Sequence, residues 1–340
     1  MILNVYTIIM LFASALTGIL AIPAWFMSYR MYAMWKQSLH AEAKTDIENK
    51  SYLLLLMATV IVIIKLLSWP FFYVTLQSYV PEIRGAMCIF GVTQFDPSMS
   101  NALQLLKPLV FFLIGGWLLL NQLDRRAETS PLFRRKFLFL HLISFMVIAD
   151  SVGDFIYFAG LKTEGSVACC TTFFDLPERA TALLPLSILG AEYERYMLPA
   201  YYSFNVMLVI FMAVSYRGVR NIAPDKNNIM GATLSGAVLA ALTAAVTIFA
   251  MFEVIAPRLM KLPYHHCIYC MWQYVPDSIL ITALFIIGVF LPCWALLLNM
   301  LGRHQETDAT LRTYIMNIYF AGAVSLSASL LMVTLHLALE

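Results

Sequence analysis

Long runs of hydrophobic residues fill most of the chain, and polar residues gather in the segments between them. Eight runs approach or exceed the roughly 20 residues that a helix needs to cross a bilayer. They cover residues 5–29, 52–76, 104–123, 137–160, 197–217, 229–255, 276–301 and 313–338. The pattern predicts an all-α integral membrane protein with eight transmembrane helices.

Composition agrees with this pattern and narrows the class of protein. Of the 340 residues 61% are hydrophobic and only 12% are charged, and the mean hydropathy is +0.77. These values lie outside the range of soluble domains. The first run is too long for a secretory signal peptide and lacks a basic start. The net charge of +2 is too small to indicate a nucleic-acid partner.

The distribution of Lys and Arg predicts the orientation, because basic residues in short loops stay in the cytoplasm. Most of the 22 basic residues lie in the connections after the first, third, fifth and seventh spans. The opposite connections, at about 77–103, 161–196 and 256–275, hold fewer. Both termini are therefore expected outside, together with these three longer loops.

Five of the six cysteines fall in the predicted outer loops: Cys88, Cys169, Cys170, Cys267 and Cys270. Outside a bacterial inner membrane, or in a secretory lumen, thiols meet oxidising conditions and form or exchange disulfides. One interpretation is that these cysteines only form structural disulfides that cross-link the loops. The other is that they react, which places a redox site on the periplasmic face of an inner membrane.

The segment "HHCIYCMWQYVPDSIL" carries the most specific motif, a C-x-x-C formed by Cys267 and Cys270. Attachment of haem c requires His directly after the second cysteine, and Met271 stands there, which excludes it. Structural zinc needs about four Cys or His ligands, and His265 and His266 would complete a set with the two cysteines. Adjacent residues rarely converge on one ion, so a zinc or copper site is the weaker interpretation.

A redox dithiol fits the motif better. Nearby cations or a helix N-terminus stabilise a cysteine thiolate, which then reacts at neutral pH. Pro276 and Asp277 are typical of a helix start. They place the dithiol at the membrane surface, close to a lipid-soluble electron carrier.

Spans four to seven resemble the vitamin K epoxide reductase-like proteins, in which four helices surround a quinone and a C-x-x-C opens the fourth. The resemblance is carried by "SVACCTTFFD" after the outward span, by "LLPLSILGAEY" before the next span, and by "CIYC". It covers about half of the chain. Three regions follow from it: an N-terminal three-helix region at 1–130, a four-helix redox core at 131–303, and a last helix at 304–340.

The resemblance implies roles for individual residues. Cys267 and Cys270 would react with the quinone, and Cys169 or Cys170 would correspond to the shuttle cysteines. The family separates its shuttle cysteines by several residues, whereas these two are adjacent, so Cys88 is an alternative disulfide partner for one of them. Pro276 also departs from the family, because it interrupts the helix that carries the active pair.

The implied reaction is thiol–disulfide exchange coupled to a membrane quinone, with a periplasmic thioredoxin-like or other redox protein as the partner. We assign Trp272, Asp150 and Asp154 to the quinone environment. Ionisable groups inside a membrane are costly and are functional candidates by default. The alternative is structural: Lys65 pairs with Asp150, while Asp154 and Glu253 reach interfacial water.

Three functions stay open from the sequence. The first is the quinone-linked thiol oxidoreductase. The second is a non-enzymatic membrane subunit that anchors a periplasmic redox complex or transports a substrate. The third is a membrane protein that handles copper or zinc through its outer Cys and His.

Overall fold

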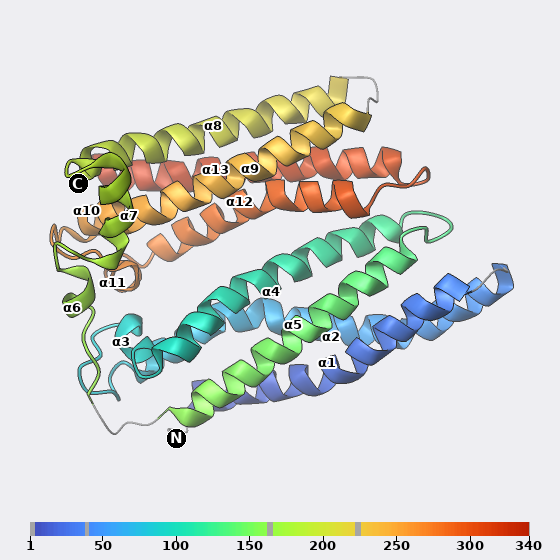
Figure 1. The fold of residues 1–340 in the computed structure, drawn as a ribbon, viewed down its shortest axis with the longest axis horizontal. Helices are drawn as coiled ribbons and strands as arrows, with labels where there is room; N and C mark the ends of the chain where they lie inside the picture. Colours follow the sequence, from blue (N-terminus) through green and yellow to red (C-terminus); the bar gives the residue numbers. More distant parts are fainter. Residues whose placement is uncertain (1–3, 38–40, 162–165, 222–225, 340) are drawn as a thin grey trace. The chain divides into compact units, whose positions relative to one another are not determined.

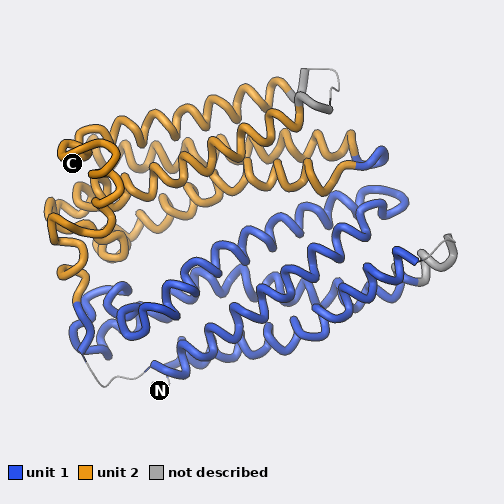
Figure 2. The backbone as a smooth tube through the Cα atoms, viewed as in Figure 1, with its two compact units in different colours: residues 1–168, 304–307 blue, residues 169–303, 308–340 orange. Residues whose placement is uncertain are grey.

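The computed structural model describes residues 4–37, 41–161, 166–221 and 226–339, and these residues fold almost entirely into helices (Figure 1). Eight of the helices are long and apolar enough to cross a membrane. This confirms the predicted all-α membrane fold. The long helices group into two compact units, which Figure 2 distinguishes by colour.

Unit 1 comprises residues 1–168 and 304–307. Its described helices are α1 (Val5–Gln37), α2 (Ala41–Tyr79), α3 (Ile89–Thr93), α4 (Pro97–Asp124) and α5 (Phe133–Gly160). The four long helices close a bundle, because α1 packs on α2 and α5, and α4 packs on the same two helices. The short α3 lies in the connection between α2 and α4 and contacts both.

Unit 2 comprises residues 169–303 and 308–340. Its described helices are α6 (Thr171–Phe174), α7 (Ala180–Leu189), α8 (Tyr193–Asn221), α9 (Lys226–Ala250), the π-helix η1 (Met251–Ile255), α10 (Ala256–Met260), α11 (Ile268–Tyr274), α12 (Ser278–Leu301) and α13 (Asp308–Leu339). Here α8, α9, α12 and α13 form the bundle, each packed on two others. The short helices lie at one end of it (Figure 1).

These units group the spans differently from the predicted regions 1–130, 131–303 and 304–340. The helix α5, which was expected to begin the redox core, packs in unit 1, and α13 packs in unit 2. The reason is visible in the contacts: α5 lies along α1 over much of its length. The bundle beside the C-x-x-C is therefore α8, α9, α12 and α13, instead of spans four to seven.

The outward surfaces of both bundles are apolar, as expected for helices in lipid. Leu105 in unit 1 is 76% exposed and Ile188 in unit 2 is 70% exposed. Inside unit 2, glycine allows two helices to approach closely. A Cβ placed on Gly288 of α12 would lie 3.0 Å from the Leu326 Cβ of α13. Small residues commonly mediate such packing in membranes, so this helix packing agrees with the integral membrane protein that helix length and composition indicate.

Candidate functional site

The C-x-x-C lies on its own short helix. Cys267 is the N-cap of α11, with extended φ and ψ of −96° and 116°, and Cys270 lies in the first turn. Helix α12 begins only at Ser278, after Val275–Asp277, so Pro276 separates the two helices. The predicted helix start at Pro276 and Asp277 is confirmed, and the dithiol sits on a separate turn before it.

Both cysteines of the motif are buried. Cys267 is 0% exposed and Cys270 is 5% exposed. The hydroxyl of Ser278 donates a hydrogen bond to the Met271 carbonyl at 3.3 Å, which ties the start of α12 to the body of α11. The dithiol is therefore held in a packed environment, away from bulk water.

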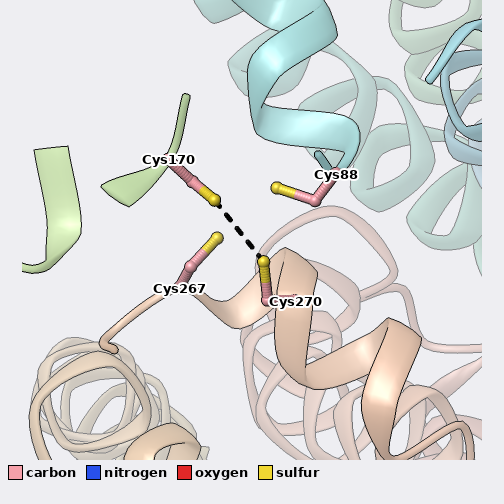
Figure 3. A group of neighbouring side chains, drawn as sticks. All are labelled: Cys88, Cys170, Cys267 and Cys270. Carbon is pink, nitrogen blue, oxygen red and sulfur yellow. Dashed lines mark hydrogen bonds between the residues drawn. The ribbon is translucent and has the colours of Figure 1, made fainter. Parts of the chain in front are cut away.

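The loop cysteines approach this dithiol. Cys170 is the N-cap of α6 and is 1% exposed, and its Sγ lies 3.6 Å from the Cys270 Sγ. The sulfur atoms of Cys170, Cys267 and Cys270 all lie within 4.8 Å of one another. In Figure 3 the side chains of Cys170 and Cys270 point toward each other, with Cys267 beside them. The half-buried Cys169 extends the series, because its Sγ is 3.7 Å from that of Cys170.

A histidine and a carboxylate accompany these sulfurs. The Nε2 atom of His265 lies 3.9 Å from the Cys170 Sγ, and its Nδ1 lies 2.5 Å from the Asp175 Oδ1. The contact with Cys170, supported by Asp175 and opposed by burial, raises the pKa of His265 to about 9. His265 is therefore a cation at neutral pH, and a cation beside a thiol favours the thiolate.

The pKa of His266 shifts in the opposite direction from the pKa of His265. The Nδ1 of His266 faces the Phe252 carbonyl at 3.1 Å and lies 4.0 Å from the Glu253 carboxylate. Burial and the nearby Arg179 lower the pKa of His266, so this imidazole is neutral at pH 7. The predicted four-ligand set of His265, His266, Cys267 and Cys270 is not the group that converges, since the two cysteines converge with Cys170 and His265 contacts Cys170 alone among these sulfurs.

The sequence did not reveal a second buried group in unit 2. Arg179 donates from Nε to the Glu253 carboxylate at 3.0 Å and forms an ion pair with it through Nη2. The Tyr193 hydroxyl donates to the same carboxylate at 2.7 Å. Glu253 lies in η1 with its side chain fully buried. The expectation that it reaches interfacial water is wrong, because Arg179 folds back from the α6–α7 connection to neutralise it.

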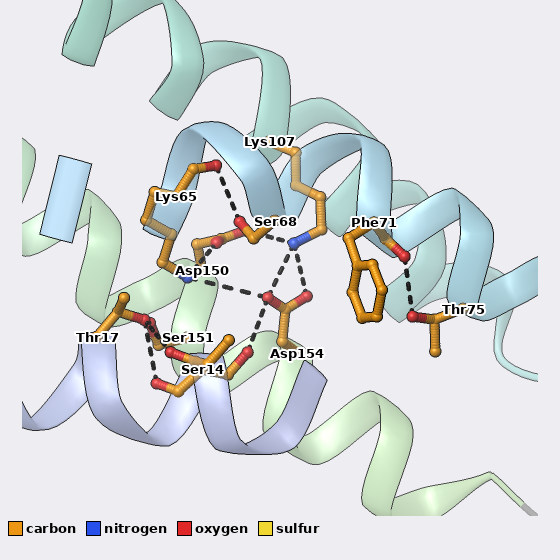
Figure 4. A network of polar contacts seen from close by, with 11 residues as sticks. Ser14, Thr17, Lys65, Ser68, Phe71, Thr75, Lys107, Asp150, Ser151 and Asp154 are labelled. Carbon is orange, nitrogen blue, oxygen red and sulfur yellow. Dashed lines mark hydrogen bonds and ion pairs between the residues drawn. The ribbon is translucent and has the colours of Figure 1, made fainter. Parts of the chain in front are cut away.

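The predicted quinone-site carboxylates belong to a different network, within unit 1 (Figure 4). Lys65 lies 2.7 Å from Asp150, which confirms their expected pairing. Lys107 bridges the two carboxylates, 3.1 Å from Asp150 and 2.7 Å from Asp154. The prediction that Asp154 reaches water is wrong, because both Lys107 and Asp154 are buried inside the bundle.

Three other residues complete the comparison with the sequence. Trp272 lies on α11, and its indole N–H donates to Thr282 at 3.1 Å. Cys88 is buried in unit 1 as the N-cap of α3, and its pairing with a loop cysteine stays a prediction. Cys293 lies in the middle of α12, with its Sγ 4.0 Å from the Ala237 carbonyl. It provides a cysteine outside the group formed by Cys170, Cys267 and Cys270, which we call the thiol site.

The thiol site permits two kinds of chemistry. Sulfur atoms in van der Waals contact, beside a cationic imidazole, are suited to thiol–disulfide exchange. Three convergent thiols are also suited to a soft metal ion. Comparisons of the chain with protein-family models, with curated proteins and with solved structures gave no match. The resemblance to vitamin K epoxide reductase-like proteins therefore stays a prediction.

Proposed function

We propose that this chain is a membrane thiol–disulfide oxidoreductase that passes electrons from a partner's dithiol to a membrane quinone. The observation that carries the proposal is the 3.6 Å separation of Cys170 Sγ and Cys270 Sγ, which brings a loop cysteine into contact with the C-x-x-C. Adjacent sulfurs extend from the half-buried Cys169 to the buried pair. This series leads from a partly accessible thiol to the end of a membrane bundle.

The cycle begins with the C-x-x-C reduced. Cys267 and Cys270 give two electrons and two protons to a quinone, and the bond between their sulfurs forms. The quinone leaves as a quinol. The Cys170 thiolate then attacks the Cys270 sulfur, so that the bond from Cys170 to Cys270 forms and the bond from Cys267 to Cys270 breaks. Cys267 departs as a thiolate and takes up a proton.

The second exchange returns the pair to its reduced state. The Cys169 thiolate, 3.7 Å from the Cys170 sulfur, attacks it and releases Cys270 as a thiol. A partner's dithiol reduces the resulting bond between Cys169 and Cys170 and is itself oxidised to a disulfide. The net reaction converts one partner dithiol and one quinone into one partner disulfide and one quinol.

His265 has a defined task in this cycle. Its protonated imidazole lies beside the Cys170 sulfur and stabilises the attacking thiolate. Asp175 holds the ring through Nδ1, so Nε2 is directed at the sulfur. This arrangement of cysteine, histidine and carboxylate follows the general logic of activated nucleophiles.

The distribution of Lys and Arg along the sequence supports the outer face of a bacterial inner membrane for these loops. The cysteine loops then face an oxidising periplasm, where a thioredoxin-like or other redox protein supplies the dithiol. The fold itself requires only a lipid bilayer.

Trapping of the exchange intermediate tests the proposal. In Cys169→Ser, the bond between Cys170 and Cys270 has lost the thiol that resolves it, so we expect this bond to accumulate after oxidation by a short-chain quinone. Peptide mass spectrometry of the purified full chain, with thiols blocked by alkylation, detects this cross-link. In the unsubstituted chain, dithiothreitol should reduce the Cys267–Cys270 bond, and the quinone should restore it.

Cys293→Ser is the matched control, because this cysteine lies outside the thiol site. It should retain quinone-dependent oxidation of dithiothreitol. The proposal fails if the Cys169→Ser chain yields no cross-link between Cys170 and Cys270, or if Cys267→Ser and Cys270→Ser both retain that activity.

A second function, soft-metal handling, is favoured by the spacing of the same sulfurs. With Zn–S bonds of about 2.3 Å, the edge of a tetrahedral thiolate site is about 3.8 Å, and Cys170 Sγ and Cys270 Sγ lie 3.6 Å apart. The Sγ atoms of Cys170, Cys267 and Cys270, which lie within 4.8 Å of one another, would supply three thiolate ligands. Cu(I) and Zn(II) both accept this donor set.

Metal analysis separates the two functions. Soft-metal handling predicts about one zinc or copper ion per purified chain, lost in Cys170→Ser and kept in Cys293→Ser. It also predicts that added quinone leaves the thiols reduced. A metal-free chain with quinone-driven disulfide formation supports the oxidoreductase instead.

A further inference from the structure

A groove with a charged rim lies on unit 2, apart from the thiol site. It has a volume of about 510 Å³. Leu198 and Tyr202 of α8 and Leu337 of α13 form part of its wall, and Arg258 and Lys261, at the end of α10, form its basic rim. Tyr202 and Thr334 join the two helices across it through their hydroxyls, 3.0 Å apart.

The groove lies where membrane-spanning helices end. Leu198 is close to the beginning of α8, Leu337 is close to the end of α13, and Arg258 belongs to the last turn before α10 ends at Met260. These three helix ends lie together in Figure 1. Membrane-spanning helices end at the boundary between hydrocarbon and water, where lipid head groups are found.

Lys261 has a left-handed backbone conformation, which residues other than glycine rarely adopt. Its φ of 56° and ψ of 31° are left-handed, and the hydrogen bonds of Lys261 N to Arg258 O and Leu262 N to Pro257 O form a Schellman cap. Glycine is the usual residue at this position, since a side chain there is strained. The exposed lysine side chain is thus presented at the groove at a conformational cost.

The charges on the rim select an anion. Among the described residues that line the groove, two are cations and none is a carboxylate. The adjoining hollow of about 290 Å³ shares Arg258 and Lys261 but also contains Glu194 and Glu253, which disfavour an anion there. An anion between the two cations is therefore best placed on the side of the groove.

We propose that this groove binds the head group of an anionic glycerophospholipid, with its phosphate between Arg258 and Lys261. The apolar walls on α8 and α13 then hold the beginning of an acyl chain. A lipid fits better than free phosphate because these walls continue along helices that face the bilayer. Basic pockets between transmembrane helices bind lipid head groups in this way.

Retention of lipid by the purified full chain tests the proposal. Detergent-solubilised protein is incubated with phosphatidylglycerol or phosphatidylcholine, and bound lipid is counted by native mass spectrometry. We expect the chain to retain phosphatidylglycerol preferentially. The double variant Arg258→Gln, Lys261→Gly should weaken this retention by about 10-fold to 30-fold.

Two controls separate binding from folding. Lys261→Gly alone removes one cation while relieving the left-handed strain, so it should lose retention without a lower melting temperature. Arg195→Gln removes an exposed cation from the first turn of α8 that does not line the groove, and it should retain lipid normally. Equal retention by the double variant and the unsubstituted chain overturns the proposal. Displacement of the lipid by millimolar inorganic phosphate overturns the choice of a lipid.

Discussion

The charged network of unit 1 and the thiol site of unit 2 are buried in opposite ways. In unit 1, two lysines and two aspartates neutralise one another inside the bundle, and Lys107 also lies 4.7 Å over the Phe72 ring. In unit 2, the thiol site brings together sulfurs that carry no fixed charge, beside one histidine. A balanced set of fixed charges holds helices together, whereas thiols beside a titratable cation can change state. The difference indicates a structural role for the first group and a chemical role for the second.

The largest expected effect tests the structural role in unit 1. Lys107→Met leaves Asp154 without its nearest cation, because Lys65 lies 3.9 Å from it. Removal of one partner from a buried ion pair costs about 3–5 kcal/mol. We therefore expect a loss of that size in the free energy of unfolding, measured in detergent.

The double variant Lys107→Met, Asp154→Leu provides the matched control. It removes both charges and keeps the remaining pair of Lys65 and Asp150, so it should recover much of the lost stability. Arg30→Met, which removes an exposed cation of α1, should leave stability nearly unchanged. If the single Lys107 variant is as stable as the Arg30 variant, the network is not structural.

The next effect concerns the reactivity of unit 2. Cys270→Ser removes the sulfur nearest to Cys170 and should reduce quinone-dependent dithiol oxidation by about 100-fold or more, because the exchange requires that sulfur. Its free energy of unfolding should fall much less than that of Lys107→Met. Parallel measurement of turnover and unfolding on both variants checks the contrast. Comparable losses of stability in Cys270→Ser and Lys107→Met would contradict the contrast between a chemical and a structural role.

A smaller effect should appear in the nucleophilicity of Cys170. His265→Asn removes the cation that favours the thiolate, so we expect alkylation of Cys170 at pH 7 to slow by about tenfold. Asp175→Asn keeps the imidazole but weakens its support and should give an intermediate rate. Time-resolved alkylation followed by peptide mass spectrometry measures both variants. Unchanged rates in His265→Asn would show that the imidazole does not act on this sulfur.

The smallest effect is a dependence of stability on pH. The pKa of His265 is raised to about 9 in the folded chain, compared with about 6.5 for an unperturbed histidine. Its stabilising contribution is therefore fully present below pH 6.5 and is lost as the pH rises through about 9. The difference in melting temperature between the unsubstituted chain and His265→Asn should shrink from pH 6 to pH 9.5. A difference that grows over this range would contradict the assignment.

The sequence was sufficient for features that depend on local pattern. Hydrophobic runs predicted the eight membrane helices, and Pro276 with Asp277 predicted where α12 starts. The four-residue spacing of Asp150 and Asp154 placed them on one face of a helix, and Lys65 was expected to pair with Asp150. These signals come from neighbouring residues or from a single helix.

Features that depend on contacts between distant segments were not predictable in the same way. Lys107 lies close to the start of the apolar run 104–123, and only the bundle reveals that its side chain meets Asp154. Arg179 and Glu253 are 74 residues apart, so no spacing rule connects them. Asp175 ends the quoted segment "SVACCTTFFD", but its role becomes visible only with His265 beside it.

The two adjacent histidines have a mechanical consequence. His265 is attached to the α6 segment through Asp175 and Cys170, whereas His266 is attached to the Phe252 carbonyl in η1. Phe174 and Phe252 also stack, with ring centroids 5.7 Å apart. One peptide unit thus links the loop that carries the thiols to the π-helix within a transmembrane segment. A displacement of that loop would therefore disturb contacts to the membrane helix at Phe252, next to the buried Glu253.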